Sequence, residues 1–497
     1  MPARQPRREK TASPPPAPTP HAPPSQKTQA LARSPWAYLL ASIVVLIPCF
    51  WQARLQAGDL SSHLYNAWLA QLIQQGRAPG LALANQTTNI LFDLILSAGF
   101  RAFGADIAQR IAVSIAVLTF VWGSFAFVSA ASGRRAWNML PLVGILAYGW
   151  VFHIGFFNFY LSLGACFFAL AMVWTADRRW IAAAALVLVV AYIAHALPVF
   201  WAIALVAYRF LVRAMPKREK LSMGLALGAM LVARVGLSNA MPTRWSLSQF
   251  QLMSGLDQVW VFDPKYLLIF ATLLLLCGLA VYRLNRGGFS WATAIPFHFL
   301  VLTAVGVLIF PDWVAVPGYK HALAFITERM SLAVSICLCA VLARAEVRRW
   351  EQYAMLAATL VFFGFLYHDE KIMNAFEDRL ERRVAELPPG QRVISAIDDP
   401  ALRVNSLTHM IDRVCVGRCF SYANYEPTTA QFRVRVVGPT PMVVSTYDES
   451  WRIQAGTYVV ADKDLPLYEI SMDQNGRLAT LSLQAGSAVG VTYWNPL

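Results

Sequence analysis

Residues 107–132 read IAQRIAVSIAVLTFVWGSFAFVSAAS, and this stretch decides the fold class. It has no charged side chain after Arg110, and it is longer than the roughly 20 apolar residues that cross a bilayer as a helix. The same character extends over the 497-residue chain, which is 57% hydrophobic and 14% charged, with a mean hydropathy of +0.47. A soluble protein has about a quarter charged residues. The sequence therefore predicts an α-helical polytopic membrane protein.

Similar apolar stretches recur along the first three quarters of the chain. Each is close to the length that a membrane-spanning helix requires. Together they predict about eleven transmembrane helices. The expected spans lie near residues 35–52, 107–132, 137–153, 157–176, 179–195, 197–214, 220–238, 264–284, 290–310, 325–344 and 349–367.

The formal net charge of +14 follows from the topology, because basic residues gather in the N-terminal tail and in short loops. Lys and Arg are retained on the cytoplasmic side of membrane proteins. With the N-terminus inside, every basic loop faces the cytoplasm, and no nucleic-acid partner is expected. Residues 1–34, rich in Pro, Ala, Ser and basic residues, are predicted to be a disordered cytoplasmic tail. The basic loops are Arg134/Arg135, Arg178/Arg179, Arg213–Lys220, Arg283/Arg286 and Arg344/Arg348/Arg349.

The same charge rule assigns residues 86–104 to the outer membrane surface. Counted as a span, this stretch would place the next basic loops outside, and it contains Asp93 and Arg101. We therefore expect a surface helix within a first outer loop of residues 53–106. The transmembrane domain is expected to cover residues 35–367.

An odd number of spans places residues 368–497 outside the cytoplasm. This region starts with a charged amphipathic helix and continues with alternating runs such as FRVRVV, PMVVST and GTYVVA, which predict strands. The expectation is a small mixed α/β extracytoplasmic domain. Cys415 and Cys419 lie in it and could form a disulfide there. The other five cysteines lie in apolar runs, as small hydrophobic residues do.

The first outer loop contains a second predicted surface helix, which starts after a cap at Asp59 or Ser61 and ends at Gly76. On it, Asp59, His63 and Asn66 form a polar stripe at positions i, i+4 and i+7, beside an apolar stripe. We expect this helix to lie on the membrane with its apolar face down. It would then present a carboxylate and an imidazole together.

This layout resembles the GT-C superfamily of membrane glycosyltransferases, in particular its aminoarabinose- and protein-mannosyl-type members. The resemblance covers about residues 35–215: a first span, an acid at the start of the outer loop, a surface helix ending in QGRAPG, and FRAFGADIAQRIAVS with Arg110. It implies an inverting transfer of a sugar from a polyprenyl-phosphate carrier on the outer face of a bacterial cell membrane. The acceptor would be a glycolipid, a polysaccharide or a protein.

In such a reaction a carboxylate accepts the proton of the acceptor, and cations stabilise the departing phosphate. The resemblance assigns the base to Asp59, with His63 assisting. Asp93, Arg234, Lys320 and Arg329 are the predicted substrate-binding residues.

The chain departs from the family in having Asp59 alone, where relatives carry paired acids. The next outer stretch, HIGFFNFY, contains no carboxylate. This argues against a two-carboxylate metal site. The only expected small-molecule requirement is the polyprenyl-linked sugar donor, and no metal is assigned.

Structural explanations remain open for each site residue. Asp59 either acts in catalysis or caps its helix, since Asp is a preferred N-cap. His63 and Asp93 are either active-site groups or polar residues of surface helices. Arg234 either contacts phosphate or extends to the interface, and Arg329 either binds phosphate or pairs with a neighbouring acid or lipid.

Two other classes of protein share the main features of this sequence. A transporter or flippase would centre its polar residues at mid-membrane, often within repeated halves. A non-catalytic membrane scaffold would use its outer domain to bind a partner. The surface helix with Asp59 discriminates between the classes, because a transferase needs it beside a cavity at the outer leaflet.

Overall fold

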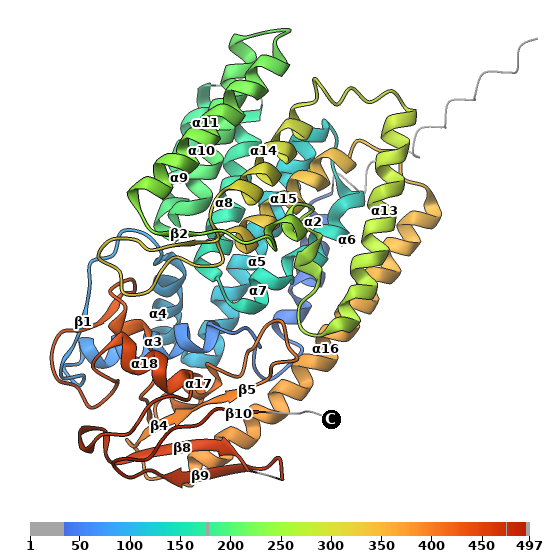
Figure 1. Cartoon of the computed structure of the whole chain (residues 1–497). Coiled ribbons are helices and arrows are strands. Elements are labelled where there is room, and N and C mark those ends of the chain that lie inside the picture. The colour runs from blue at the N-terminus through green and yellow to red at the C-terminus, as the bar shows by residue number, and fades with distance from the viewer. Residues whose placement is uncertain (1–33, 175–177, 474, 494–497) are drawn as a thin grey trace, which may run out of the picture. The chain divides into compact units, whose positions relative to one another are not determined.

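The computed structural model describes residues 34–174, 178–473 and 475–493 (Figure 1). The chain divides into two compact units, residues 1–44 and 45–497. Helix α2 (Pro35–Leu46) begins in the first unit, and the other helices and strands of the described residues belong to the second. The tail predicted for residues 1–34 lies outside the described residues, apart from Ser34.

The described part of the chain is mostly helical, and six helical segments in it are long and apolar enough to cross a membrane. Their length follows from uninterrupted runs of apolar residues, which confirms the membrane character predicted from composition. These segments are α5 (Ala105–Ser132), η2 with α6 and α7 (Trp137–Ile154), α8 (Phe157–Trp174), α10 (Ala196–Ala214), α11 (Glu219–Ala240) and η4 with α13 (Pro264–Arg286).

Shorter or more polar helices complete the apolar part. α2 continues into η1 (Ile47–Cys49), and α9 (Arg178–Ala194) and α14 (Ile295–Ile309) are also apolar but short. They are joined by α15 (Ile326–Leu342) and by α16 (Arg349–Ala385). The sequence placed a domain boundary at residue 367, but α16 continues through it because its second half remains a good amphipathic helix.

Both helices predicted within residues 53–106 are present. α3 (Leu60–Gln74) ends just before Gly76, whose φ of +69° suits a residue without a side chain. α4 (Leu91–Phe103) has 13 residues, which is too few to span a bilayer. The remaining short helices are α12 (Gln249–Leu252), η3 (Leu256–Val259), α17 (Met410–Cys415), η5 (Glu426–Thr428), α18 (Tyr447–Gln454) and η6 (Asp462–Asp464).

A four-stranded mixed sheet near the C-terminus confirms the predicted small mixed sheet. Its order is β6-β4-β8-β9, with parallel pairing except between β8 and β9. Figure 1 shows it in orange and red with α17 and α18 beside it. Its strands are β4 (Arg392–Ser395), β6 (Phe420–Ser421), β8 (Leu467–Met472) and β9 (Leu478–Ser482).

The two faces of this sheet are buried in different cores. Successive residues of a strand point to opposite faces. Val393 and Ile470 belong to the large core that continues into the apolar helices, whereas Ile394 and Leu467 belong to a smaller core with residues of α18. The sheet therefore lies between the helical region and α18.

Three two-stranded pairings involve the other strands. One pairing joins two regions that are far apart in the sequence. Residues Leu81–Leu83 pair antiparallel with Val434–Val436, in the C-terminal region. The strands are β1 (Leu81–Leu83) with β7 (Val434–Val436), β2 (Thr243–Arg244) with β3 (Trp313–Val314), and β5 (Ile397–Asp398) with β10 (Thr492–Tyr493).

Two of the three quoted strand predictions were wrong. FRVRVV contains β7, but PMVVST forms no strand, and GTYVVA makes one isolated bridge at Val459. In PMVVST the consecutive residues Val443 and Val444 are both buried, so the segment does not have the alternating faces of a strand. The alternation of apolar and polar residues therefore predicted more strands than these segments form.

An ion pair between Arg413 on α17 and Glu377 on α16 fixes the C-terminal region against the helices. Arg413 Nε and Nη2 donate to the two carboxylate oxygens of Glu377 at 2.7 Å each, and both side chains are buried. Arg413 Nη1 also donates to the Leu55 carbonyl at 2.8 Å, and Gln56 Nε2 donates to Glu377 at 2.8 Å. The pair therefore also holds the loop that leads to Asp59.

Cys415 and Cys419 form a disulfide directly after this helix, which resolves the alternative left open by the sequence. The five other cysteines are free and buried, as expected for small hydrophobic residues.

The substitution Glu377→Ala tests the ion pair. It leaves the Arg413 charge buried without its partner, and breaking a buried pair in this way costs about 3–5 kcal/mol. We expect a clear fall in the thermal unfolding midpoint of the purified protein. Glu386→Ala is the matched control on the end of the same helix, where the exposed pair with Arg383 contributes at most about 1 kcal/mol. Equal losses in the two variants would contradict this role.

Candidate active site

Asp59 stands at the N-terminal boundary of α3, where its backbone is fixed by the turn after α7. The Gly58 and Asp59 amides donate to the carbonyls of His153 and Ile154 at 2.7 and 3.0 Å. Gly155, with φ +95°, makes room for this contact, since a Cβ atom there would lie 2.5 Å from the Asp59 nitrogen. The Asp59 side chain makes no capping bond to α3. Its carboxylate is therefore not used as a cap.

His409, just before α17, approaches this carboxylate from the C-terminal region. Its Nε2 lies 3.8 Å from Asp59 Oδ1, and its Nδ1 lies 3.2 Å from Asp412 Oδ2. Burial acts to lower the pKa of His409, but Asp412, and then Asp59 and Glu426, outweigh it, so the pKa is raised. The His409 imidazole therefore lies between the Asp59 and Asp412 carboxylates, which favour its protonated form.

Arg329, in the first turn of α15, supplies a positive charge near Asp59. Its guanidinium lies 3.7 Å from the ring centroid of Phe156, and it is attracted to Asp59 and Tyr425. Its Nε is buried and has no hydrogen-bond partner among the described residues. The side chain can therefore still donate to an anion.

Aromatic rings cover this group of side chains. The Tyr425 ring lies 5.6 Å from His409, 5.9 Å from His321 and 5.8 Å from Phe432, measured between centroids. These rings come from the outer loop before α15 and from the C-terminal region. The Tyr425 ring therefore contacts His409, whose Nε2 lies 3.8 Å from Asp59 Oδ1.

His63 and Asp93 form a pair beside this group. His63 Nδ1 lies 2.7 Å from Asp93 Oδ1, and Asn158 Nδ2 donates to Asp93 Oδ2 at 2.7 Å. Burial acts to lower the pKa of His63, but Asp93 outweighs it and the pKa rises to about 10. His63 is buried, so it is not presented at the surface as the sequence suggested. This pair joins α3, α4 and α8 and positions the start of α3.

The polar face of α3 is covered by the C-terminal region rather than by solvent. Ser62 Oγ donates to Glu426 Oε1 at 3.0 Å, and Asn424 Nδ2 donates to Asn66 Oδ1 at 3.0 Å. The Tyr65 hydroxyl accepts from the Ser421 amide at 3.0 Å. The expected exposed polar stripe is therefore an internal contact surface.

The two remaining predicted cations lie elsewhere in the outer region. Arg234 Nε donates to the Ile309 carbonyl at 2.7 Å and so satisfies the end of α14. The Lys320 side chain is exposed, and its backbone amide donates to Thr429 at 2.9 Å. Of the three predicted substrate-binding cations, Arg329 is the one attracted to Asp59.

An apolar groove of about 970 Å³ is lined by side chains of α10, α11 and α14 and by the segment between α14 and α15. Ile326, Thr327 and Met330 at the start of α15 also line it, and Arg329 lies on the same turn without lining the groove itself. On α10 the lining extends from Leu197 to Leu211, about 20 Å along the helix axis. The groove is therefore long and apolar.

Sequence reasoning missed the residues that come from the C-terminal region. His409, Tyr425 and Glu426 have no motif or spacing that relates them to Asp59, and only the fold brings them together.

Among the described residues, no group of three His, Cys, Asp or Glu side chains is arranged to hold a metal ion. Searches of protein-family models, curated proteins and solved structures find no match to this chain.

The buried carboxyl of Glu426 predicts a pH dependence of stability. Burial raises its pKa from 4.5 to about 8. Between these values the folded state holds a proton that the unfolded chain has released, so the free energy of unfolding falls as the pH rises. The thermal unfolding midpoint of the wild-type protein should fall as the pH is raised from about 5 to about 8. In Glu426→Gln this fall should be much smaller, because the amide does not titrate. Glu386→Gln, at an exposed site, should keep the wild-type slope; an unchanged slope in Glu426→Gln would refute the assignment.

Proposed function

We propose that this chain is a GT-C-type membrane glycosyltransferase that moves a sugar from a polyprenyl-phosphate carrier to an acceptor on the outer face of the membrane. The observation that carries the proposal is that Arg329, which is attracted to the Asp59 carboxylate, shares its turn of α15 with Ile326, Thr327 and Met330, which line the apolar groove. The groove suits the isoprenoid chain, the cation suits its phosphate, and the carboxylate suits the attacking group of the acceptor.

The proposed topology has eleven spans with the N-terminus inside. Helices lie at all the expected positions: six long apolar segments, three shorter ones, α15 and the first part of α16. Arg134, after α5, donates to the Ala343 carbonyl after α15, and Arg283 at the end of α13 pairs with Glu351 at the start of α16. These contacts bring together loops that the charge rule assigns to the cytoplasm.

The opposite end of α15 carries Arg329, which is attracted to Asp59, and this supports an outer active site. The end of α7 also contacts Asp59, because the Ile154 carbonyl accepts from the Asp59 amide. The Cys415–Cys419 disulfide agrees with this location, because disulfides persist in oxidising compartments.

The donor would bind with its isoprenoid chain along the groove and its phosphate against Arg329. The guanidinium is held over the Phe156 ring, so its orientation is fixed before the ligand arrives. A preorganised cation that stabilises charge growing on the leaving group acts more strongly in the transition state than in the ground state. The free donor capacity of Nε is then used by a phosphate oxygen.

The transfer follows from these positions. The acceptor oxygen or nitrogen attacks the anomeric carbon while the bond from that carbon to the phosphate oxygen breaks. The attacking group gives its proton to Asp59, and the polyprenyl phosphate leaves with the bonding electron pair. Attack opposite the leaving group inverts the anomeric configuration. His409, hydrogen-bonded to Asp412, places a positively charged imidazole 3.8 Å from Asp59 Oδ1 and so stabilises the Asp59 carboxylate before the proton arrives.

The C-terminal region would close the site. Tyr425 and His409 cover Asp59, and covering limits hydrolysis of the donor by water. This role explains why α3 uses its polar face for contacts with residues 421–426.

The substitution Asp59→Asn tests the base. It keeps the size of the side chain but cannot accept the proton, so we expect transfer to fall by about 10²–10⁴-fold. The measurement compares envelope glycans and glycolipids by mass spectrometry after deletion of the coding gene and complementation. Wild type should restore one missing sugar, and Asp59→Asn and Arg329→Ala should not, at equal protein levels.

Lys320→Ala is the matched control for Arg329→Ala, since this exposed cation lies in the same outer loop. It should restore the sugar as wild type does. An unchanged glycan profile after deletion would refute the transferase, and full complementation by Asp59→Asn would remove this residue from the mechanism.

The substitution Ala229→Trp tests the groove as the site of the isoprenoid chain. Ala229 lines the groove on α11, and a bulky ring there should block a long chain. We expect the apparent affinity for polyprenyl-linked donors to fall by about tenfold or more, from lost apolar burial. Val232→Trp is the matched control, since Val232 is 73% exposed on the same helix. Equal donor affinity in both variants would show that the chain binds elsewhere.

A further inference from the structure

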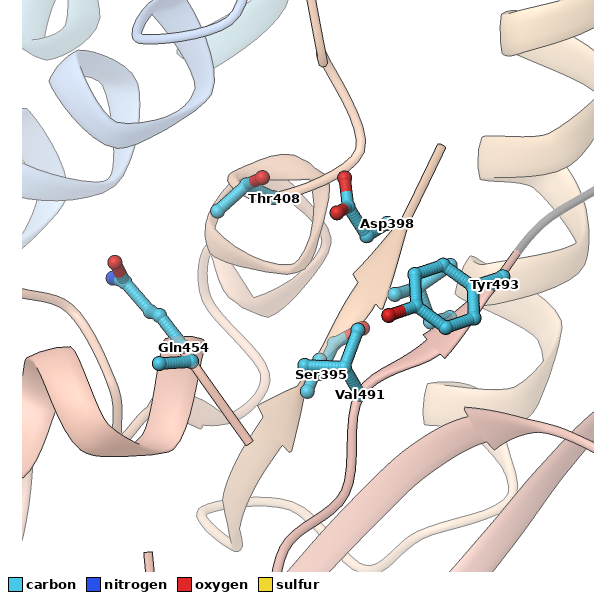
Figure 2. A pocket seen from close by; sticks show the side chains of 9 residues that line it. Ser395, Asp398, Thr408, Gln454, Val491 and Tyr493 are labelled. Atoms are coloured by element: carbon cyan, nitrogen blue, oxygen red, sulfur yellow. The ribbon is translucent and has the colours of Figure 1, made fainter. Parts of the chain in front are cut away.

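A second cavity, of about 310 Å³, lies within the C-terminal region (Figure 2). Its volume is at the lower end of the range of small-ligand sites, about 300–1,000 Å³. The wall brings together hydrogen-bonding side chains from five separate segments: Ser395 of β4, Asp398 of β5, Thr408 before α17, Gln454 of α18 and Tyr493 of β10.

The charge of this wall limits the class of ligand. Asp398 is its one ionisable carboxylate, and no Lys, Arg or His is among the described residues that line it. A phosphate or carboxylate ligand would meet a negative charge without a compensating cation. Neutral hydroxyl groups, or an amine beside Asp398, match the mixture of carboxylate, amide and hydroxyl groups.

Several of these groups keep hydrogen-bonding capacity for a ligand. Gln454 Nε2 donates to the Ala423 carbonyl at 3.2 Å, which leaves its amide oxygen as an acceptor. Figure 2 shows the Asp398 carboxylate turned toward Thr408. Tyr493 is 63% exposed and offers a ring face, with a hydroxyl at its end, to the C–H face of a sugar.

Two residues close in sequence to the lining residues carry buried polar atoms that have no hydrogen-bond partner among the described residues. Ser406 Oγ and Asp399 Oδ2 are buried and have no hydrogen bond among the described residues. Asp399 follows the lining residue Asp398, and Ser406 precedes Thr408 by two positions. Neither residue lines the cavity itself, so these atoms mark the polarity of the segments around it.

The cavity adjoins the candidate active site through two segments. Thr408 directly precedes His409, whose Nε2 lies 3.8 Å from Asp59 Oδ1. Gln454 donates a hydrogen bond to Ala423, two residues before Tyr425, whose ring contacts His409. A ligand in the cavity would therefore contact the segments that carry His409 and Tyr425.

We propose that this cavity is the acceptor subsite, and that the acceptor is a neutral or amine-bearing oligosaccharide. The inference rests on the proposed transferase function and selects among its acceptors. A saccharide unit held in the cavity would direct the next unit, with its attacking hydroxyl, toward Asp59. A phosphorylated lipid headgroup does not match the charge of the wall.

The test measures binding of defined trisaccharides to the full chain in lipid nanodiscs, by calorimetry or ligand-observed NMR. The probes are mannotriose, arabinotriose, a glucosamine trisaccharide and, for the anionic case, mannose 6-phosphate. At least one of the three trisaccharides should bind, and mannose 6-phosphate should not. Tyr493→Ala and Thr408→Val should each weaken binding by about five- to tenfold.

Thr480→Val, on β9 and away from the cavity, makes the same side-chain change as Thr408→Val and should leave binding unchanged. If no trisaccharide binds, or if Tyr493→Ala and Thr408→Val bind as wild type does, the subsite is refuted while glycan transfer can still be observed. If trisaccharides bind at the cavity but gene deletion changes no glycan, the transferase is refuted and a saccharide-binding site remains.

Discussion

The bidentate pair between Arg413 and Glu377 is the constraint on which the arrangement of the site depends. Burying two charges is unfavourable unless the geometry is good and the remaining donors and acceptors are satisfied. Here the Leu55 carbonyl and the Gln56 amide complete the contacts. Because the pair joins α16, α17 and the loop before α3, these three segments share one fixed point. His409, at the start of α17, is thereby brought to Asp59.

The proposed chemistry needs this assembly, since no single segment supplies it. The carboxylate comes from the first outer loop, the cation from the start of α15, and the imidazole and tyrosine from the C-terminal region. The apolar groove is lined in part by α15, the helix that carries Arg329, and the polar cavity is lined by Thr408, which directly precedes His409. In the proposed reaction the donor would approach Asp59 from the groove and the acceptor from the cavity.

The parts of this structure that the sequence predicted are those governed by local periodicity. Apolar runs located the helices, and the turn at Gly76 and the short helix carrying Asp93 followed from composition and loop charge. Contacts between distant segments were not predictable. Nothing near His63 indicates that α3 would be covered, and His409 and Tyr425 lie in a region where alternation suggested strands. The cavity adjoining them also depends on tertiary packing alone.

The most direct test of the central claim is a cryo-EM structure of the full chain in nanodiscs with a long-chain polyprenyl phosphate. The account predicts that the phosphate contacts Arg329, the isoprenoid chain follows the groove between α10, α11 and α14, and the Asp59 carboxylate faces the phosphate. A phosphate bound away from Arg329, with the groove filled by ordinary lipid, would contradict it.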